Sequence, residues 1–188
     1  MARWEPDSRG RLEQAALALY GERGFENTTV AEIAKRAGVT ERTFFRHYAD
    51  KREVLFGGGR EMQELLVTTV EDAPKSLAPI DAVAAGVEAV ATALQKRREI
   101  ARQRQKVIAA NAELRERELI KLASWASAIA DALRRRGVDD PAARLTAEAG
   151  LAVFRVAFER WIDESNKREF PELVRESVDQ LKAVTAGV

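Results

Sequence analysis

Cysteine and histidine, which often act as nucleophile, base or metal ligand, are almost absent from this sequence of 188 residues. There is no cysteine, which excludes disulfides and thiol chemistry, and there is a single histidine, His47. The glycine run from Gly57 to Gly59 follows no predicted strand, so it does not indicate a phosphate-binding loop. The sequence therefore predicts that the protein is not an enzyme, has no catalytic residues, and holds no metal ion and no cofactor.

Composition leaves the partner open but limits the class of protein. Hydrophobic residues make up 46% of the chain, which supports a buried core, and the formal net charge is only +1. Because the chain is nearly neutral, a nucleic-acid-binding function has to be argued from the positions of individual cations. No apolar run is long enough to span a bilayer and the start, MARWEPDSRG, is polar, so we expect a cytoplasmic protein without a membrane partner.

Two short helices joined by a glycine are predicted within residues 28–55. Thr29 and Glu32 have the spacing of a capping box, in which each side chain binds the other residue's backbone amide. Gly38 suits the left-handed conformation that ends a helix, and Thr40 can cap the next helix, over residues 41–48. This order is typical of a helix-turn-helix, whose second helix enters the DNA major groove.

The spacing of apolar residues is helical along the whole chain, so we predict an all-α protein. We expect a helix-turn-helix domain over residues 1–52 and a larger helical domain over residues 53–188. A second capping box, from Asp50 to Glu53, is predicted to open a long helix that runs to about Asp72. The three glycines at 57–59 inside it cost roughly 1 kcal/mol each relative to alanine. They indicate either close packing or a soft joint between the two domains.

The last two predicted helices carry surplus apolar surface. The helix after Pro141 is apolar on two faces, and the final helix, over about residues 171–186, has one further apolar stripe. This surplus favours a homodimer that forms through both helices; the alternative is that both faces are filled within one subunit. The predicted dimer contacts are Val153, Val156, Val174, Val178 and Leu181.

The run TTVAEIAKRAGVTERTFFRHYADKREVLF, preceded by an amphipathic helix that ends in GERGFENT, resembles the amino-terminal signature of the TetR family of bacterial transcriptional repressors. The resemblance covers roughly residues 8–56. It implies an N-terminal three-helix DNA-binding domain, joined by a long helix to a C-terminal helical domain for ligand binding and dimerisation. It also implies a homodimer that binds a palindromic operator and leaves it when a small molecule binds.

The resemblance also implies which residues contact double-stranded DNA. Arg42, at the front of the recognition helix, can read a guanine through its two-pronged donor geometry; the alternative is a phosphate contact. Phe45 stands where the family usually has tyrosine, so it lacks a hydroxyl and can offer only apolar contact. The full set of implied DNA contacts is Thr29, Thr40, Arg42, Thr43, Phe45, Arg46, His47 and Lys51.

The effector pocket is implied among the helices from about Leu65 to Trp161. Arg104 and Asn111 lie on an otherwise apolar stripe, where a polar group needs a partner. We therefore predict a mainly apolar ligand, whose acidic group, if it has one, meets Arg104; the alternative for each residue is ordinary core packing. The predicted ligand contacts are Arg104, Val107, Ile108, Asn111, Trp125, Phe154 and Phe158.

Taken together, these patterns predict a ligand-responsive, homodimeric repressor that binds DNA in the major groove. The alternative from a different class is a helical adaptor that binds another protein and uses the helix-turn-helix only as a scaffold. Repressor and activator use the same module, so this sequence leaves that choice open, together with the operator, the effector and the regulated genes.

Overall fold

The computed structural model describes residues 7–187, which form nine α-helices and two 3-10 helices and contain no strand. The predicted all-α fold is confirmed. The chain divides into two compact units. Unit 1 takes the residues up to Gly58 together with residues 103–118, and unit 2 takes Gly59–Arg102 together with the residues from Leu119 onward. Residues 103–118, which the sequence analysis assigned to the C-terminal domain, thus belong to the compact unit of the helix-turn-helix.

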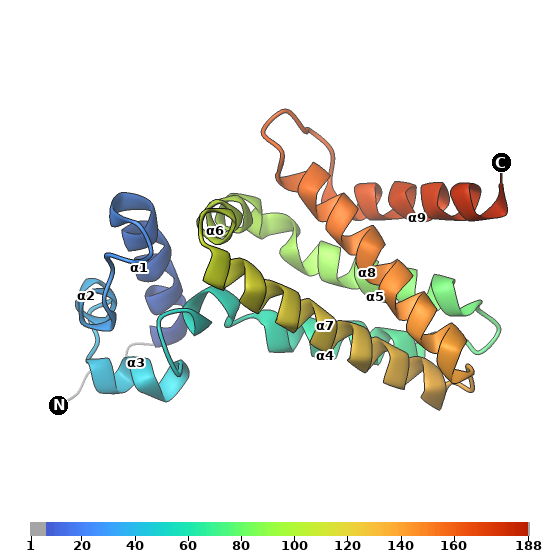
Figure 1. Ribbon diagram of the computed structural model, residues 1–188, viewed down its shortest axis with the longest axis horizontal. Helices are drawn as coiled ribbons and strands as arrows, with labels where there is room; N and C mark the ends of the chain where they lie inside the picture. Colours follow the sequence, from blue (N-terminus) through green and yellow to red (C-terminus); the bar gives the residue numbers. More distant parts are fainter. Residues whose placement is uncertain (1–6, 188) are drawn as a thin grey trace. The chain divides into compact units, whose positions relative to one another are not determined.

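Unit 1 begins with three helices that include the predicted helix-turn-helix (Figure 1). These are α1 (Ser8–Arg23), α2 (Val30–Arg36) and α3 (Glu41–His47), followed by the 3-10 helix η1 (Glu53–Phe56). Asp7 caps α1 by accepting a hydrogen bond of 2.8 Å from the Gly10 amide. The core of the unit forms because each helix buries one apolar stripe, centred on the fully buried Leu12, Ile33 and Phe44.

The second segment of unit 1 comes from the end of α6 (Arg98–Ala110) and the start of α7 (Ala112–Arg135). Ile108 and Leu114 are fully buried in the same core as the helix-turn-helix residues. Two ion pairs, from Arg52 to Glu113 and from Arg117 to Glu53, join this segment to the residues that follow α3. We call residues 103–118 the docked segment.

The predicted long helix from Asp50 to Asp72 is wrong. The chain makes the short helix η1, turns, and starts α4 (Gly59–Asp72) only at Gly59. The Asp50 carboxylate does accept from the Glu53 amide at 3.2 Å, but the Glu53 carboxylate pairs with Arg117, so the reciprocal half of the capping box is replaced. Consecutive glycines are poor helix formers, which explains why the helix does not run through them.

Gly57 is explained by close packing, whereas Gly58 and Gly59 are not. A Cβ atom added at Gly57 would lie 2.9 Å from the Tyr48 ring, and one added at Gly58 or Gly59 would meet nothing within 4 Å. Neither of the latter two glycines has a positive φ. Packing thus accounts for one of the three glycines.

Unit 2 contains the remaining helices. They are α4, α5 (Pro79–Leu94), the 3-10 helix η2 (Gln95–Arg97), the first residues of α6, most of α7, α8 (Asp140–Ile162) and α9 (Phe170–Ala186). In this unit α5 packs against α4, α8 and α9, and α8 packs against α9 (Figure 1). None of the described helices meets the length and hydropathy that a membrane crossing requires.

An aromatic cluster lies in the core of unit 2. Trp161 and Phe170 are fully buried and stack with their ring centroids 4.6 Å apart. Phe154 and Phe158 join them at centroid distances of 5.8 to 5.9 Å, and Trp125 contacts Phe154 at 5.9 Å. Aromatic side chains bury large apolar areas, so this cluster dominates the packing of the unit.

Candidate nucleic-acid interface

The start of α2 is built as the capping-box pattern predicts. The Glu32 amide donates to the Thr29 hydroxyl at 3.3 Å, and the Thr29 amide donates to the Glu32 carboxylate at 2.9 Å. Gly38 ends the helix with a φ of 68°, in the left-handed region that favours glycine. The predicted capping box and its glycine turn are confirmed, so local sequence determines where α2 begins and ends.

The recognition helix α3 turns one face inward and one outward. Thr40 caps it by accepting from the Thr43 amide at 3.2 Å. Phe44 is fully buried and Tyr48, its C-cap, is also buried, so they anchor the helix to the core. Phe45, directly beside Phe44 in the sequence, is 55% exposed. The inward anchors thereby fix which side chains the helix presents to a partner.

The outward face of α3 carries two exposed arginines whose guanidinium groups lie open. Neither Arg42 nor Arg46 makes a hydrogen bond or an ion pair with any residue from 7 to 187. The exposed arginines of the neighbouring helices differ, because Arg36 pairs with Glu22 at 2.8 Å and Arg23 pairs with Glu32 at 2.7 Å. We call Arg42, Phe45 and Arg46 the open face of α3. Unpaired guanidinium groups are available to base edges and phosphates.

His47 lies at the end of α3 and is already bonded within the unit. Its Nε2 atom is 2.9 Å from the Ser8 hydroxyl. Partial burial, and then the positive charges of Arg46 and Arg9, lower the pKa of His47 below its ordinary value of 6.5. The ring is therefore neutral at pH 7, and a phosphate beside it would favour the charged form.

Lys51 contacts unit 1 itself. Its Nζ atom donates to the carbonyl oxygens of Phe25 at 2.8 Å and Thr28 at 3.0 Å, with a longer contact of 3.3 Å to Glu26. The family resemblance implies a phosphate contact for Lys51, and the sequence does not predict these bonds to the turn before α2. The pairing of an amino group with carbonyls far away in the sequence leaves no local pattern.

The residues predicted for the ligand are divided between the two units. Arg104, Val107, Ile108 and Asn111 lie in the docked segment of unit 1, and Trp125, Phe154 and Phe158 lie in the aromatic cluster of unit 2. Asn111 donates to the Val107 carbonyl at 2.7 Å. Each polar group on the predicted stripe thus has a protein partner.

Arg104, in the docked segment, has three partners within unit 1. Its Nε donates to the Leu55 carbonyl at 2.6 Å, its Nη1 pairs with Glu118 at 2.9 Å, and its guanidinium lies 5.0 Å from the centroid of the Phe56 ring. Burial lowers the pKa of Arg104, and Glu118 acts in the opposite direction. The guanidinium stays charged, since arginine is not deprotonated in proteins.

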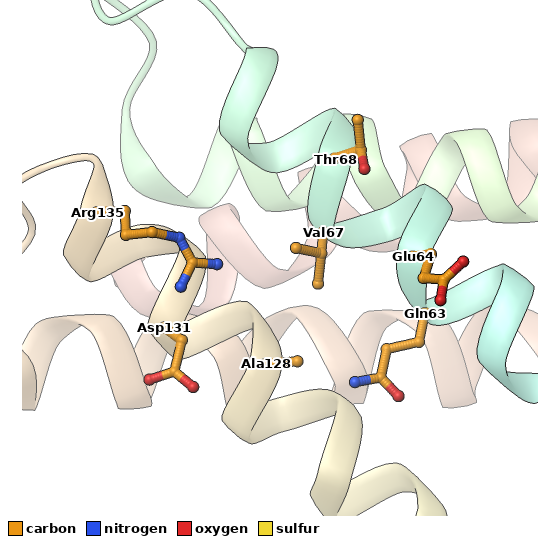
Figure 2. A pocket seen from close by; sticks show the side chains of 7 residues that line it. All are labelled: Gln63, Glu64, Val67, Thr68, Ala128, Asp131 and Arg135. Atoms are coloured by element: carbon orange, nitrogen blue, oxygen red, sulfur yellow. The ribbon is translucent and has the colours of Figure 1, made fainter.

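A groove opens in unit 2 between α4 and α7 (Figure 2). It has a volume of about 260 Å³. Val67 and Ala128 form its apolar part, and Asp131 and Arg135 lie on the α7 side. Arg135 is held by Glu71 at 2.6 Å. The complete lining is Gln63, Glu64, Val67, Thr68, Ala128, Asp131 and Arg135.

The predicted dimer contacts divide into buried and exposed residues. Val153, Val174 and Val178 are buried, and Leu181 packs against the same core, so these four already pack within one subunit. Val156 is 48% exposed. Leu145, also on α8, is 72% exposed, so the large apolar side chains that stay exposed on α8 are at these two positions.

Two family descriptions match separate parts of this chain. Residues 13–56 match the description "Bacterial regulatory proteins, tetR family", and residues 77–186 match "MftR C-terminal domain". The chain belongs to the TetR family of DNA-binding transcriptional regulators and has an MftR-type C-terminal domain. This is a family of regulators and not of enzymes.

The curated relatives divide between long and short matches. A putative mycofactocin biosynthesis transcriptional regulator, MftR of Mycobacterium tuberculosis, is 28% identical over 158 residues, which cover 82% of this chain and 80% of that protein. The transcriptional regulator TcmR of Streptomyces glaucescens is 36% identical over 83 residues, which cover 44% of this chain. That match spans only 37% of TcmR's own length.

Solved structures share the fold over nearly the whole chain. A SmeT–triclosan complex has a TM-score of 0.67 at 20% identity, covering 94% of this chain and 90% of that one. The regulator FadR from Bacillus subtilis, in complex with stearoyl-CoA, has a TM-score of 0.62 at 20% identity, covering 92% and 96%. At this identity the likeness shows a common fold.

Proposed function

We propose that this TetR-family regulator is a homodimeric repressor that binds a palindromic operator in the major groove and is released by a small, mainly apolar effector. The observation that carries the DNA part is the open face of α3, where Phe45 is 55% exposed and the two arginines make no hydrogen bond or ion pair with residues 7–187. Arg42 reads a base edge and Arg46 contacts a phosphate in this proposal. The protein acts where its DNA is, in the cytoplasm.

The neighbouring polar residues support the same interface. Thr29, Thr40 and Thr43 are caps or cap partners whose hydroxyls sit at helix starts. We propose that they contact the DNA backbone while they keep the capping bonds that they accept, because the single donor hydrogen of a hydroxyl can turn to a phosphate. For Thr29 this hydrogen has to leave the Glu32 carboxylate, to which it donates at 2.9 Å in the free protein. His47 donates to a phosphate once it is protonated.

The homodimer is proposed to form through α8 and α9. Leu145 and Val156 are eleven positions apart, close to three turns of helix, so they lie on one face of α8. Ala149 and Ala152 lie between them on that face, and small residues there allow a second helix to approach closely. A symmetric pair of α3 helices then matches a palindrome whose half-sites lie on one face of the DNA.

The effector is proposed to bind in unit 2, at the aromatic cluster. Trp125, Phe154 and Phe158 offer aromatic walls to an apolar ligand. The fold neighbours support this class of ligand, since one is a complex with triclosan and another a complex with stearoyl-CoA. The ligand contacts predicted in the docked segment are not part of this proposal, because Arg104 is already paired with Glu118.

The proposal is tested with DNA from upstream of the protein's own gene. Full-length protein is titrated onto this DNA in a gel-shift assay at several salt concentrations, with a scrambled fragment as the control. Phosphate contacts release counterions, so log K should fall linearly with log salt concentration, and the upstream fragment should bind more tightly. Binding that does not change with salt would contradict the proposal and favour the protein-binding adaptor.

A further inference from the structure

Lys51 follows the recognition helix α3, and its ammonium group donates hydrogen bonds to backbone carbonyls of unit 1. An ammonium has three donor hydrogens. The three carbonyl oxygens within reach of Nζ, those of Phe25, Glu26 and Thr28, match that number. The same Nζ lies 4.4 Å from the centroid of the Phe25 ring, which adds a cation–π contact.

All three carbonyls belong to the turn between α1 and α2. A second hydrogen bond, from a buried side chain, also stabilises this turn. Thr28 is buried, and its hydroxyl donates to the Gly24 carbonyl at 2.9 Å. The Phe25 ring packs edge-on against Tyr20 with centroids 5.2 Å apart. The buried Thr28 hydroxyl thus stabilises the turn from the core side. The Lys51 ammonium donates to the three backbone carbonyls that surround it.

The backbone of Lys51 is also hydrogen-bonded within unit 1. The Tyr20 hydroxyl, on α1, donates to the Lys51 carbonyl at 2.6 Å. Burial, followed by the charge of Asp50, raises the pKa of Tyr20, so the hydroxyl keeps its proton at any physiological pH. Lys51, which follows α3, is therefore bonded to α1 through its backbone carbonyl and to the turn before α2 through its side chain.

We propose that Lys51 is a positioning residue that closes the helix-turn-helix, linking the segment after α3 to the turn before α2, and that it supports DNA binding without contacting a phosphate. This departs from the direct contact that the family resemblance implies for the same residue, and it rests on the DNA-binding role of α3. A phosphate could recruit Lys51 only if these carbonyls gave up its ammonium group, although the Phe25 carbonyl would keep the Thr28 amide at 3.3 Å. Buried or converging polar groups without partners are costly, which opposes that exchange.

The test compares Lys51→Met with Arg46→Met, which removes an exposed charge of the open face. Affinity for the upstream DNA is measured across salt concentrations for both variants and the wild type. Each lost phosphate contact lowers the magnitude of the salt slope by about one. Arg46→Met should show that change, whereas Lys51→Met should bind about tenfold more weakly with an unchanged slope. A slope that falls by about one in Lys51→Met would overturn the proposal.

A second readout needs no DNA. Hydrogen exchange is followed in the free proteins at the Thr28 amide, bonded to Phe25 O, and the Ile33 amide, in the first turns of α2. Lys51→Met should speed exchange there by about tenfold, because the turn loses its outer donors. Arg46→Met should leave it unchanged. Unchanged exchange in Lys51→Met would contradict the positioning role.

Tyr20→Phe keeps the inference testable if Lys51→Met does not fold. This substitution removes one hydroxyl, and its buried ring cannot reach DNA. We expect affinity to fall about threefold with an unchanged salt slope, since only the positioning of α3 is weakened. If Tyr20→Phe binds the upstream DNA with wild-type affinity, the positioning role proposed for Lys51 is overturned. Loss of salt dependence in the wild-type protein would instead overturn the proposed DNA-binding interface.

Discussion

The open face of α3 and the docked segment use the same kinds of side chain in opposite ways. Arg42 and Arg46 make no hydrogen bond or ion pair within the described part of the chain, whereas Arg104 bonds to the Leu55 carbonyl and pairs with Glu118. Phe45 is exposed, whereas Ile108 is fully buried. Arginine and large apolar residues can serve either structure or recognition, and the presence or absence of internal partners distinguishes the two roles.

The largest expected effect is on the stability of unit 1. Ile108→Ala removes a fully buried side chain from its core and should lower the free energy of unfolding by about 2–5 kcal/mol. Chemical denaturation measures this. Ile120→Ala is the matched control, because Ile120 is 60% exposed and its loss should change stability by less than about 0.5 kcal/mol. Equal effects of the two substitutions would contradict the docking of residues 103–118.

Next in size is the effect of filling the close contact at Gly57. Gly57→Ala should destabilise by about 1–3 kcal/mol, because the new Cβ meets the buried ring of Tyr48 and the carboxylate of Glu13. Gly58→Ala is the control. With open space around it, this substitution should be neutral or stabilise by about 0.4–1 kcal/mol. Thermal unfolding compares them, and a destabilising Gly58→Ala would show a constraint that packing does not explain.

Arg42→Ala should change the affinity and sequence preference of DNA binding but not the stability of the protein. It should weaken binding to the operator by about 1–3 kcal/mol and relax the preference for one base pair, if Arg42 reads a guanine. Binding to a panel of single-base operator variants by fluorescence anisotropy measures both effects. An equal loss on every sequence would assign Arg42 to a phosphate. A melting temperature equal to that of the wild type is expected, since Arg42 has no partner among residues 7–187.

The smallest effect concerns pH. Because the pKa of His47 is lowered in the folded protein, the unfolded chain binds this proton more readily, so His47 makes the protein slightly less stable as pH falls below about 6.5. DNA phosphates favour the protonated ring, so operator affinity should rise modestly over the same fall in pH. His47→Asn should remove this rise. A pH profile that is identical in His47→Asn would show that His47 does not contact the backbone.

Local patterns in the sequence were sufficient for the DNA-binding module. The Thr29–Glu32 capping box, Gly38 and the Thr40 cap each depend on residues three or four positions apart, and all were predicted correctly. The course of the chain after Asp50 was predicted wrongly, because one half of a capping box is compatible with a 3-10 turn and Glu53 has a distant partner, Arg117.

Long-range pairings could not be predicted from one sequence. The apolar stripe through Ile108 was recognised, but the stripe does not say which core it joins. The partners of Arg104 and Lys51 lie 14 to 49 and 23 to 26 positions away, respectively, so no local spacing identifies them. A cation on an amphipathic pattern was therefore interpreted as a binding residue in both cases, although the fold provides internal partners.

The assignment of the open face of α3 to DNA is tested most directly by hydroxyl-radical footprinting of the protein with and without operator DNA. Phe45 is exposed and aromatic, so it should be oxidised in the free protein and protected when DNA covers the open face. Ile120, exposed on α7, is the internal control and should react equally in both states. Protection of Phe45 alone is the predicted result. Undiminished oxidation of Phe45 in saturated operator complexes would contradict the assignment of this face to DNA.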